Sequence, residues 1–234
     1  MRVGIIQSCY IPWRGYFDFI NSVDLFIFHD DLQYTKGDWR NRNRIKTQKG
    51  MNWLTVPVHY SKVEQLILNT EIDYSRAWPK KHLAQIQANY RGAPYLSDVI
   101  DIMSTINTRE FNTISGLNIF LIKQICHYLN ITTPMIMSSE LQVTGKKTER
   151  LIEILKKVNG CTYLSGASAD DYLKKSMFRE NGVSLEYKSY DYPEYRQLWD
   201  GYDAGLSIID LIANQGPGAR DFISSLSPNQ IIIP

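Results

Sequence analysis

Apolar and polar residues follow one another along the chain in blocks that predict strands and helices in turn. Residues 3–6 and 25–28 are almost wholly apolar, which is typical of strands covered on both faces in a parallel sheet. Pro12 and Gly15 interrupt the chain between these runs, and apolar residues then recur at helical spacing over about residues 17–22. The opening of the chain therefore predicts a strand, a helix and a second strand.

The later blocks extend this alternation and add a long helical stretch. Further strands are expected at residues 53–59, 65–68, 134–138, 162–164 and 183–187, and helices at residues 147–158, capped near Thr144, and 206–213. Residues from about 75 to 130 are helical in period, with a break at 92–94. Residues 165–172 form a small-residue loop that is expected to enter a helix and offer its free amides to a ligand. The pattern predicts one α/β domain over residues 1–234, with a Rossmann-like, mostly parallel sheet and a helical insertion or annex in the middle of the chain.

Polar residues gather where the first two predicted strands end. Open α/β sheets bind ligands at the carboxyl ends of their strands, so these residues are candidates for a site. They are Gln7, Tyr10, Trp13, Gly15 and Tyr16 after the first strand, His29, Asp30, Asp31, Gln33 and Tyr34 after the second, and then the basic run Arg40, Asn41, Arg42, Asn43 and Arg44. Later candidates are Ser165, Gly166, Asp170 and Tyr172 in the small-residue loop, and Ser207 and Asp210 on the last helix.

These residue types favour acid–base chemistry and the binding of an anion. If one of the adjacent carboxylates Asp30 and Asp31 were desolvated beside the other, its pKa would rise and it would serve as a general base; His29 titrates near neutrality without perturbation. Arginine forks match phosphate oxygens in pairs, so the basic run suits a phosphate group. Structural alternatives stay open: solvated turn residues for the aspartates, a solvent-facing strand edge for the arginines, rim packing for Trp13 and Tyr16, and helix capping for the last pair.

Composition and the missing motifs exclude several classes of protein. The 26 basic and 24 acidic residues give a formal charge of +2, which makes no case for nucleic-acid binding. Three cysteines without CxxC spacing favour buried thiols in a reducing cytoplasm, and no apolar run approaches the roughly eighteen residues of a membrane span. The chain lacks GxSxG, GxGxxG, GxxxxGK[ST] and HxxxH, so a common hydrolase, dinucleotide or P-loop site is disfavoured and no metal site is expected.

Several separate motifs carry a resemblance to a known family. Gln7 followed by YIPWRGYFDFINSVD, then DLQYTKGDWRNRNRI, LTVPV, APYL, YLSGASADDYL and LSIIDLIANQG occur in the order found in the WbqC-like family of bacterial surface-polysaccharide clusters, which this chain resembles over nearly its whole length. A histidine often precedes the glutamine in that family, where this chain has Ile6. The resemblance implies a cytoplasmic enzyme of O-antigen, lipopolysaccharide or related glycan assembly that acts on a nucleotide-activated amino sugar.

Within that setting, the leading hypothesis is transfer of an acyl or aminoacyl group, such as glycyl, to the sugar amine from an activated donor. Asp30 or Asp31 would be the base with His29 in reserve, and Arg40, Arg42 and Arg44 would hold the diphosphate. Trp13 and Tyr16 would stack on the base or sugar. The acyl group would be oriented by Asn41, Asn43, Ser165 and Gly166. A metal-dependent glycosyltransferase, a non-catalytic sugar-nucleotide-binding protein and an ATP-dependent amide ligase are the alternatives, and association between copies of the chain stays open.

Overall fold

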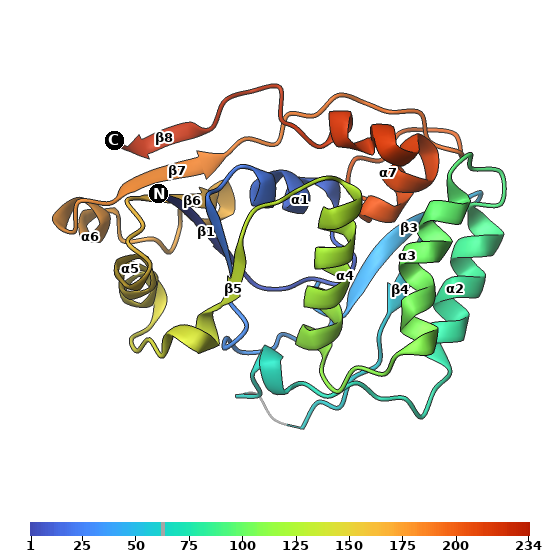
Figure 1. Cartoon of the computed structure of the whole chain (residues 1–234), viewed down its shortest axis with the longest axis horizontal. Helices are drawn as coiled ribbons and strands as arrows, with labels where there is room; N and C mark the ends of the chain where they lie inside the picture. The colour runs from blue at the N-terminus through green and yellow to red at the C-terminus, as the bar shows by residue number, and fades with distance from the viewer. Residues whose placement is uncertain (62–63) are drawn as a thin grey trace.

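A computed structural model describes residues 1–61 and 64–234, and its centre is a six-stranded sheet with the strand order β5-β2-β1-β6-β7-β8 (Figure 1). The strands are β1 Arg2–Ile6, β2 Leu25–Phe28, β5 Met135–Met137, β6 Thr162–Gly166, β7 Ser184–Lys188 and β8 Gln230–Ile233. All neighbouring pairs are parallel except β7 and β8. This confirms the predicted Rossmann-like, mostly parallel α/β fold.

Successive side chains along each strand point to opposite faces of the sheet, and both faces are buried. Val3 and Ile5 of β1 pack with helices α5 (Lys147–Lys157) and α6 (Lys175–Glu180), in one apolar cluster. Phe26 of β2 points the other way, toward helix α1 (Arg14–Asn21), and a Cβ added at Gly4 would lie 2.4 Å from the Phe19 ring of that helix. Glycine at that position therefore lets α1 approach β1 closely.

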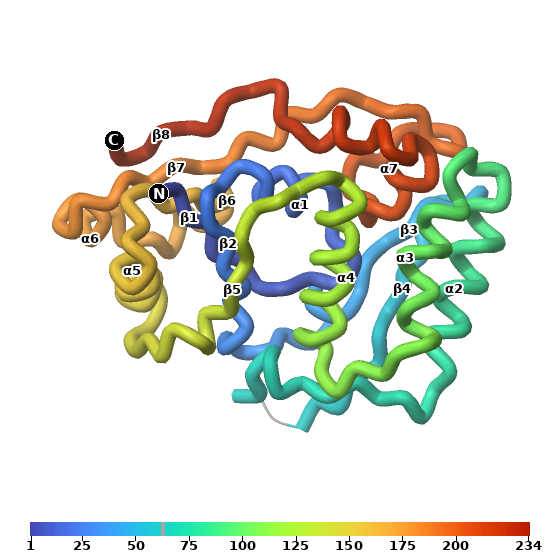
Figure 2. The backbone as a smooth tube through the Cα atoms, in the orientation of Figure 1, coloured from blue at the N-terminus to red at the C-terminus, as the bar shows by residue number. Residues whose placement is uncertain are grey.

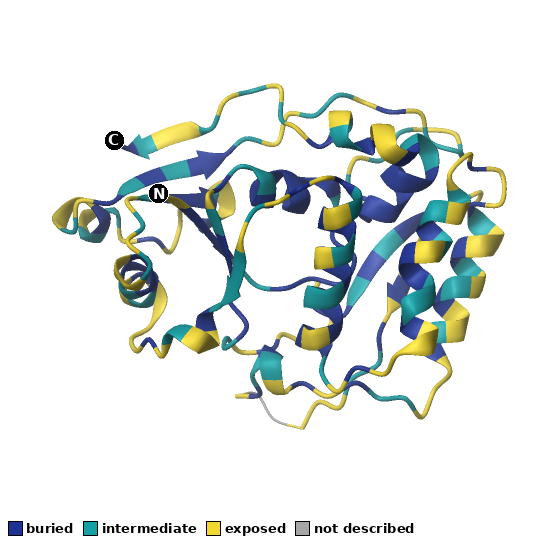
Figure 3. Ribbon diagram, viewed as in Figure 1, coloured by how far each residue is buried: buried dark blue, intermediate teal, exposed yellow. Residues whose placement is uncertain are grey.

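The long helical stretch forms α2 (Trp78–Asn89), α3 (Leu96–Thr108) and α4 (Ile114–Tyr128), as the sequence predicts. A two-stranded antiparallel hairpin, β3 (Arg42–Thr47) and β4 (Gly50–Thr55), lies between α4 on one side and α2 and α3 on the other, beside helix α7 (Ile208–Gln215) (Figure 2). One apolar cluster joins residues of β2, α1, β3, β4 and α2 to α4. Exposed residues follow the outer sides of α2 and α3, and buried ones face this shared core (Figure 3).

Four local predictions were wrong. The strand expected at residues 53–59 is instead the hairpin strand β4, which ends at Thr55, and residues 65–68 hold one bridge and the start of a 3-10 turn, Ile67–Asn69. The loop after Ser165 enters only a 3-10 turn, Ala167–Ala169, and α6 begins later, at Lys175. Helix α5 has Lys146 at its N-cap without a side-chain cap, rather than Thr144. Strand β8 was not among the predicted strands.

The three cysteines are unpaired in the described residues. Cys9 and Cys126 are buried, Cys161 is exposed, and all three are free thiols. Within the described residues, no helix is both long and apolar enough to cross a membrane. The shared core is consistent with the expectation of one domain over residues 1–234, which stays a prediction.

Candidate functional site

The strand order reverses between β1 and β6, and a cavity of about 570 Å³ lies at that point. The chain builds the sheet outward from β1 through β2 to β5, and then crosses to β6 on the other side of β1. In open α/β sheets such a reversal leaves a crevice at the carboxyl ends of the strands. We call this the switch-point cavity; its polar and charged lining is Gln7, His29, Arg40, Lys147, Arg150, Ser165, Ser168, Tyr163, Tyr172 and Tyr190, with Gly166 beside them.

Three cations line this cavity. Arg40 follows the second strand in sequence and donates to the side-chain oxygen of Gln7, while Asp38 lies 3.6 Å away as its ionic partner. Lys147 and Arg150 come from the first turn of α5, where Lys147 is exposed and has a left-handed φ of 51°. A left-handed backbone costs a non-glycine residue about 1–2 kcal/mol. Positive charge at a helix N-terminus, where the backbone amides also favour anions, makes this edge electropositive.

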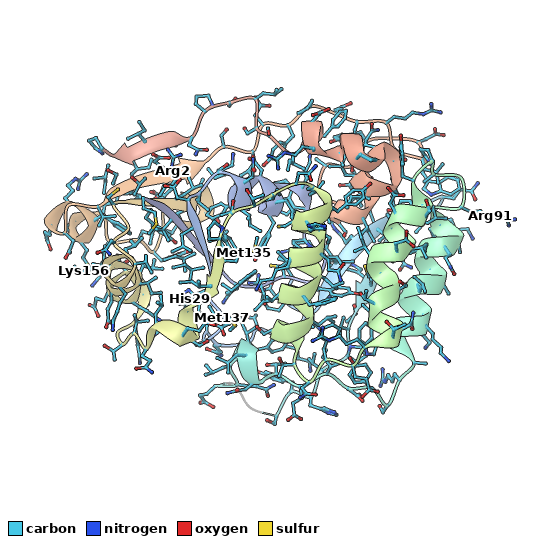
Figure 4. The ribbon with its side chains drawn as sticks, viewed as in Figure 1. Arg2, His29, Arg91, Met135, Met137 and Lys156 are labelled. Carbon is cyan, nitrogen blue, oxygen red and sulfur yellow. The ribbon has the colours of Figure 1, made fainter. Side chains whose placement is uncertain are left out.

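His29, Arg150 and Asp31 form one connected group at the end of β2. The Arg150 guanidinium donates to Nε2 of His29 at 3.3 Å and forms an ion pair with Asp31. Because arginine only donates, Nε2 must be the unprotonated nitrogen. Burial lowers the pKa of His29 to about 4; the charge of Asp31 opposes this shift and that of Arg150 adds to it. Figure 4 shows His29 beside Met137, the β5 residue that pairs with Phe28.

Asp30 has a different environment from its neighbour. It is 2% exposed, and it accepts hydrogen bonds from the Ser138 hydroxyl at 3.2 Å and from the Ser139 amide and hydroxyl at 3.2 and 2.8 Å. These bonds tie the end of β2 to the turn after β5. Asp30 is therefore the desolvated member of the pair, and its full engagement in hydrogen bonds favours a structural role for it.

The loop after β1 is held by its own polar groups. The Tyr16 hydroxyl donates to the Gln7 carbonyl at 3.1 Å, and the Tyr10 hydroxyl bonds Nδ1 of His82 at 2.9 Å in the core. Tyr34 is 1% exposed. A Cβ added at Gly15 would lie 2.3 Å from the Trp13 ring, so the glycine makes room for that indole. These contacts give Tyr10 and Gly15 structural duties, and Tyr34 is part of the apolar core.

A second cavity, of about 340 Å³, lies on the other side of the same loop. Cys9, Pro12, Trp13, Tyr16, Trp39, Asn43, Arg44 and Gly205 line it. Trp13 also packs against Tyr190 of the switch-point cavity, with ring centroids 5.3 Å apart, so the two cavities are neighbours. Burial raises the pKa of the Cys9 thiol, which keeps it protonated and disfavours a nucleophilic role.

The basic run divides between the two cavities instead of converging on one ligand. Arg40 lines the switch-point cavity, whereas Arg44 lines the second cavity and Arg42 lies over the Trp53 ring at 4.3 Å. The amide of Asn41 donates to the Val56 carbonyl, and that of Asn43 donates to the carbonyls of residues 10 and 11. Asn43 thus holds the hairpin to the loop after β1, and Asn41 closes the base of the hairpin.

The remaining candidates lie partly in the switch-point cavity and partly away from it. Ser165, Gly166 and Tyr172 line it. The Asp170 carboxylate is paired with Lys175 and accepts from the Tyr187 hydroxyl. Away from it, Ser207 caps α7, Asp210 is wholly buried between the hydroxyls of Tyr90 and Tyr195, and Gln33 is an exposed bridge partner of Leu66.

A model of the WbqC-like protein family matches residues 7–222, which include every residue of both cavities except Ile5 and Ile6. The chain belongs to this family. It is 42% identical, over 225 residues that cover 95% of this chain and 97% of the relative, to an uncharacterized protein of Mycobacterium tuberculosis, Rv1507c. No solved structure matches the chain.

Sequence reasoning missed the two cations that α5 brings to the cavity of this WbqC-like protein. Lys147 and Arg150 lie on a helix that was predicted correctly. In a parallel sheet, a helix that leads into a strand starts at the carboxyl edge, so its first turn faces the ligand crevice. That rule identifies both residues without a structure. Ser168 and Tyr190 were also missed, and only folding brings Tyr190 to Trp13.

Proposed function

We propose that this WbqC-like protein is a glycan-assembly transferase that joins an acyl or aminoacyl group to the amine of a nucleotide-linked amino sugar. The observation that carries the proposal is the cluster of Arg40, Lys147 and Arg150 in the switch-point cavity. Arg40 and Arg150 each have one carboxylate partner, Asp38 and Asp31. The lining therefore keeps excess positive charge, which suits a diphosphate.

We assign the general base to His29. Of the three predicted candidates it is the one that lines the cavity, whereas Asp30 is bound by Ser138 and Ser139, and Asp31 by Ser138 and Arg150. Arg150 donates to Nε2 of His29 and, after burial, contributes to the low pKa of that histidine. When Arg150 turns to a phosphate, Nε2 is released, and the added negative charge raises the pKa of His29 toward neutrality. Substrate binding would thus prepare the base.

The other parts of the cavity fit acyl transfer. The hydroxyls of Ser165 and Ser168 are donors that can stabilise the oxyanion formed when the amine attacks a carbonyl group. Tyr163, Tyr172 and Tyr190 offer aromatic faces to a sugar ring or base. Gln7 lies between the loop and Arg40 and orients that guanidinium. The metal-dependent alternative needs Asp30 and Asp31 as metal ligands, whereas both carboxylates are engaged by Ser138, Ser139 and Arg150.

A binding and turnover experiment with UDP-glucosamine and UDP-N-acetylglucosamine as probes tests the proposal. We expect the free-amine probe to stabilise the protein without added metal, by about 2.7 kcal/mol at a hundredfold excess over Kd. Arg150→Met should abolish this shift. Lys156→Met is the matched control, because Lys156 is an exposed cation at the other end of α5.

Measurement of turnover distinguishes the role of the general base from that of the groups that bind the substrate. His29→Gln should bind the probe and lower kcat about 10²–10⁴-fold, which is the usual contribution of a general base. Failure of amino-sugar nucleotides of any base to bind would refute the proposal, and binding that required a divalent metal would favour glycosyl transfer. Release of AMP or ADP from ATP during turnover would favour the ligase.

A further inference from the structure

The hairpin carries an exposed group of aromatic and basic side chains beside the second cavity. Trp39 and Trp53 are each 40% exposed, with ring centroids 5.5 Å apart. The Arg42 guanidinium lies 4.3 Å from the Trp53 ring, and that of Arg44 lies 5.5 Å from Trp39 and 5.8 Å from Trp53. We call these four side chains the aromatic shelf.

The shelf and the second cavity form one continuous surface. A cavity of about 310 Å³ lies against the shelf, and it shares Trp39 and Arg44 with the second cavity. The second cavity then runs along Cys9 and Trp13 to the loop whose other side faces the switch-point cavity through Gln7. A ligand lying on this surface would have one end on the shelf and the other at Trp13, whose ring packs on Tyr190 of the switch-point cavity.

Folding alone does not explain the shelf. Two exposed indoles cost hydrophobic free energy that burial would have gained. Among the described residues, no carboxylate forms an ion pair with Arg42 or Arg44, and the buried Nε of each lacks a hydrogen-bond partner. Arg44 donates to the Gly205 carbonyl at 3.0 Å, which fixes its guanidinium plane. A buried donor without a protein partner is satisfied by water or by a bound ligand.

The chemistry of the shelf suits a nucleotide. Indole faces stack on bases, and guanidinium groups held against indoles pair with phosphate oxygens. The second cavity has few charged groups, so it suits an uncharged arm rather than a second phosphate. The surface therefore fits a molecule that combines a phosphorylated nucleotide with a long uncharged arm.

We propose that the aromatic shelf and the second cavity bind the acyl donor, and that this donor is a thioester on a nucleotide-bearing carrier of the coenzyme A type. The inference rests on the proposed function, because it supplies the second substrate. The neutral amine of the sugar, after His29 removes the ammonium proton, forms the new bond to the thioester carbonyl carbon. The carbon–sulfur bond then breaks, and the carrier leaves as a thiolate that takes up a proton, while the nitrogen loses its second proton to become an amide.

Binding of coenzyme A tests this assignment directly. Trp39 and Trp53 should report it by quenching of tryptophan fluorescence, and calorimetry should give the same Kd with and without UDP-glucosamine. Trp53→Ala should weaken coenzyme A about tenfold or more, the usual effect of losing a stacked base. Arg42→Gln should weaken it by a similar factor, because it removes a charged hydrogen bond to phosphate. Arg150→Met should leave coenzyme A binding unchanged. Arg91→Gln is the matched control, because Arg91 is exposed at the far end of the helical stretch (Figure 4).

The outcomes separate this inference from the proposed function. If coenzyme A does not bind, or if Trp53→Ala and Arg42→Gln leave its affinity unchanged, the donor assignment is wrong. If these two variants instead weaken the sugar nucleotide, and UDP-glucosamine displaces coenzyme A, the shelf holds the base of the acceptor. In each case binding of the sugar nucleotide to the switch-point cavity, and its loss in Arg150→Met, still decides the proposed function. Arg42→Gln decides the matter if Trp53→Ala fails to fold.

Discussion

At the scale of single residues, adjacent side chains can have opposite duties. Asp30 and Asp31 are neighbours in sequence, but Asp30 ties β2 to the turn at Ser138 and Asp31 pairs with Arg150. Sequence reasoning identified the carboxylates and His29 as a group. It could not predict their partners, because those partners lie more than a hundred residues away in the chain. Long-range contacts are fixed by the fold, not by local residue pattern.

The first prediction concerns the contact between Arg150 and His29. Arg150→Met removes a cation that lowers the pKa of His29 and leaves the charge of Asp31, which raises it. The pKa of His29 should therefore rise from about 4 toward the ordinary value of 6.5. An NMR titration of the imidazole resonances measures the shift. Lys147→Met is the control, because Lys147 is a cation of the same cavity that lies on the same turn; an equal rise in both variants would contradict the specific role of Arg150.

At the scale of elements, the apolar pattern predicted the strands and helices that are buried in the core. It missed the short segments whose structure depends on irregular contacts. Strands β1, β2 and β6 and helices α2 to α5 follow directly from it. Residues 53–59 misled because WLTVPVH has strand-like residues on both sides of Pro57, yet the ladder ends at Thr55. The prediction of a helix directly after Ser165 was wrong: residues 167–169 form a single 3-10 turn.

The second prediction concerns the start of α1. A methyl group at Gly15 meets the Trp13 ring at 2.3 Å, so Gly15→Ala must displace the indole that packs on Tyr190. We expect a loss of about 1–3 kcal/mol in the free energy of unfolding, as for other overpacked sites. Gly116→Ala is the matched control in the first turn of α4, where the nearest atom is 3.4 Å away. Because alanine is the better helix former by about 1 kcal/mol, that variant should be neutral or stabilised. Urea denaturation compares the two, and equal stability would mean that Trp13 has room to move.

At the scale of the whole molecule, the sheet and the helical stretch share one core, and each contains a buried histidine. His29 ends β2, and His82 lies on α2, where Nδ1 bonds the Tyr10 hydroxyl and Nε2 bonds the Thr55 carbonyl at 3.1 Å. Burial lowers the pKa of both to about 4, from 6.5. We expect residues 1–234 to unfold as one unit. Protonation of His29 and protonation of His82 must then both affect the same unfolding transition.

The third prediction follows from the sign of this linkage. Between pH 6.5 and about 4 the unfolded chain binds a proton at each histidine and the folded chain does not, so the free energy of unfolding falls as the pH falls. Each histidine contributes about 1.4 kcal/mol per pH unit in this window. His82→Gln should reduce the slope of stability against pH by about that amount. Tryptophan fluorescence and circular dichroism should give coincident transitions at every pH. Two separated transitions, only one of which responds to His82→Gln, would mean that the helical stretch folds apart from the sheet.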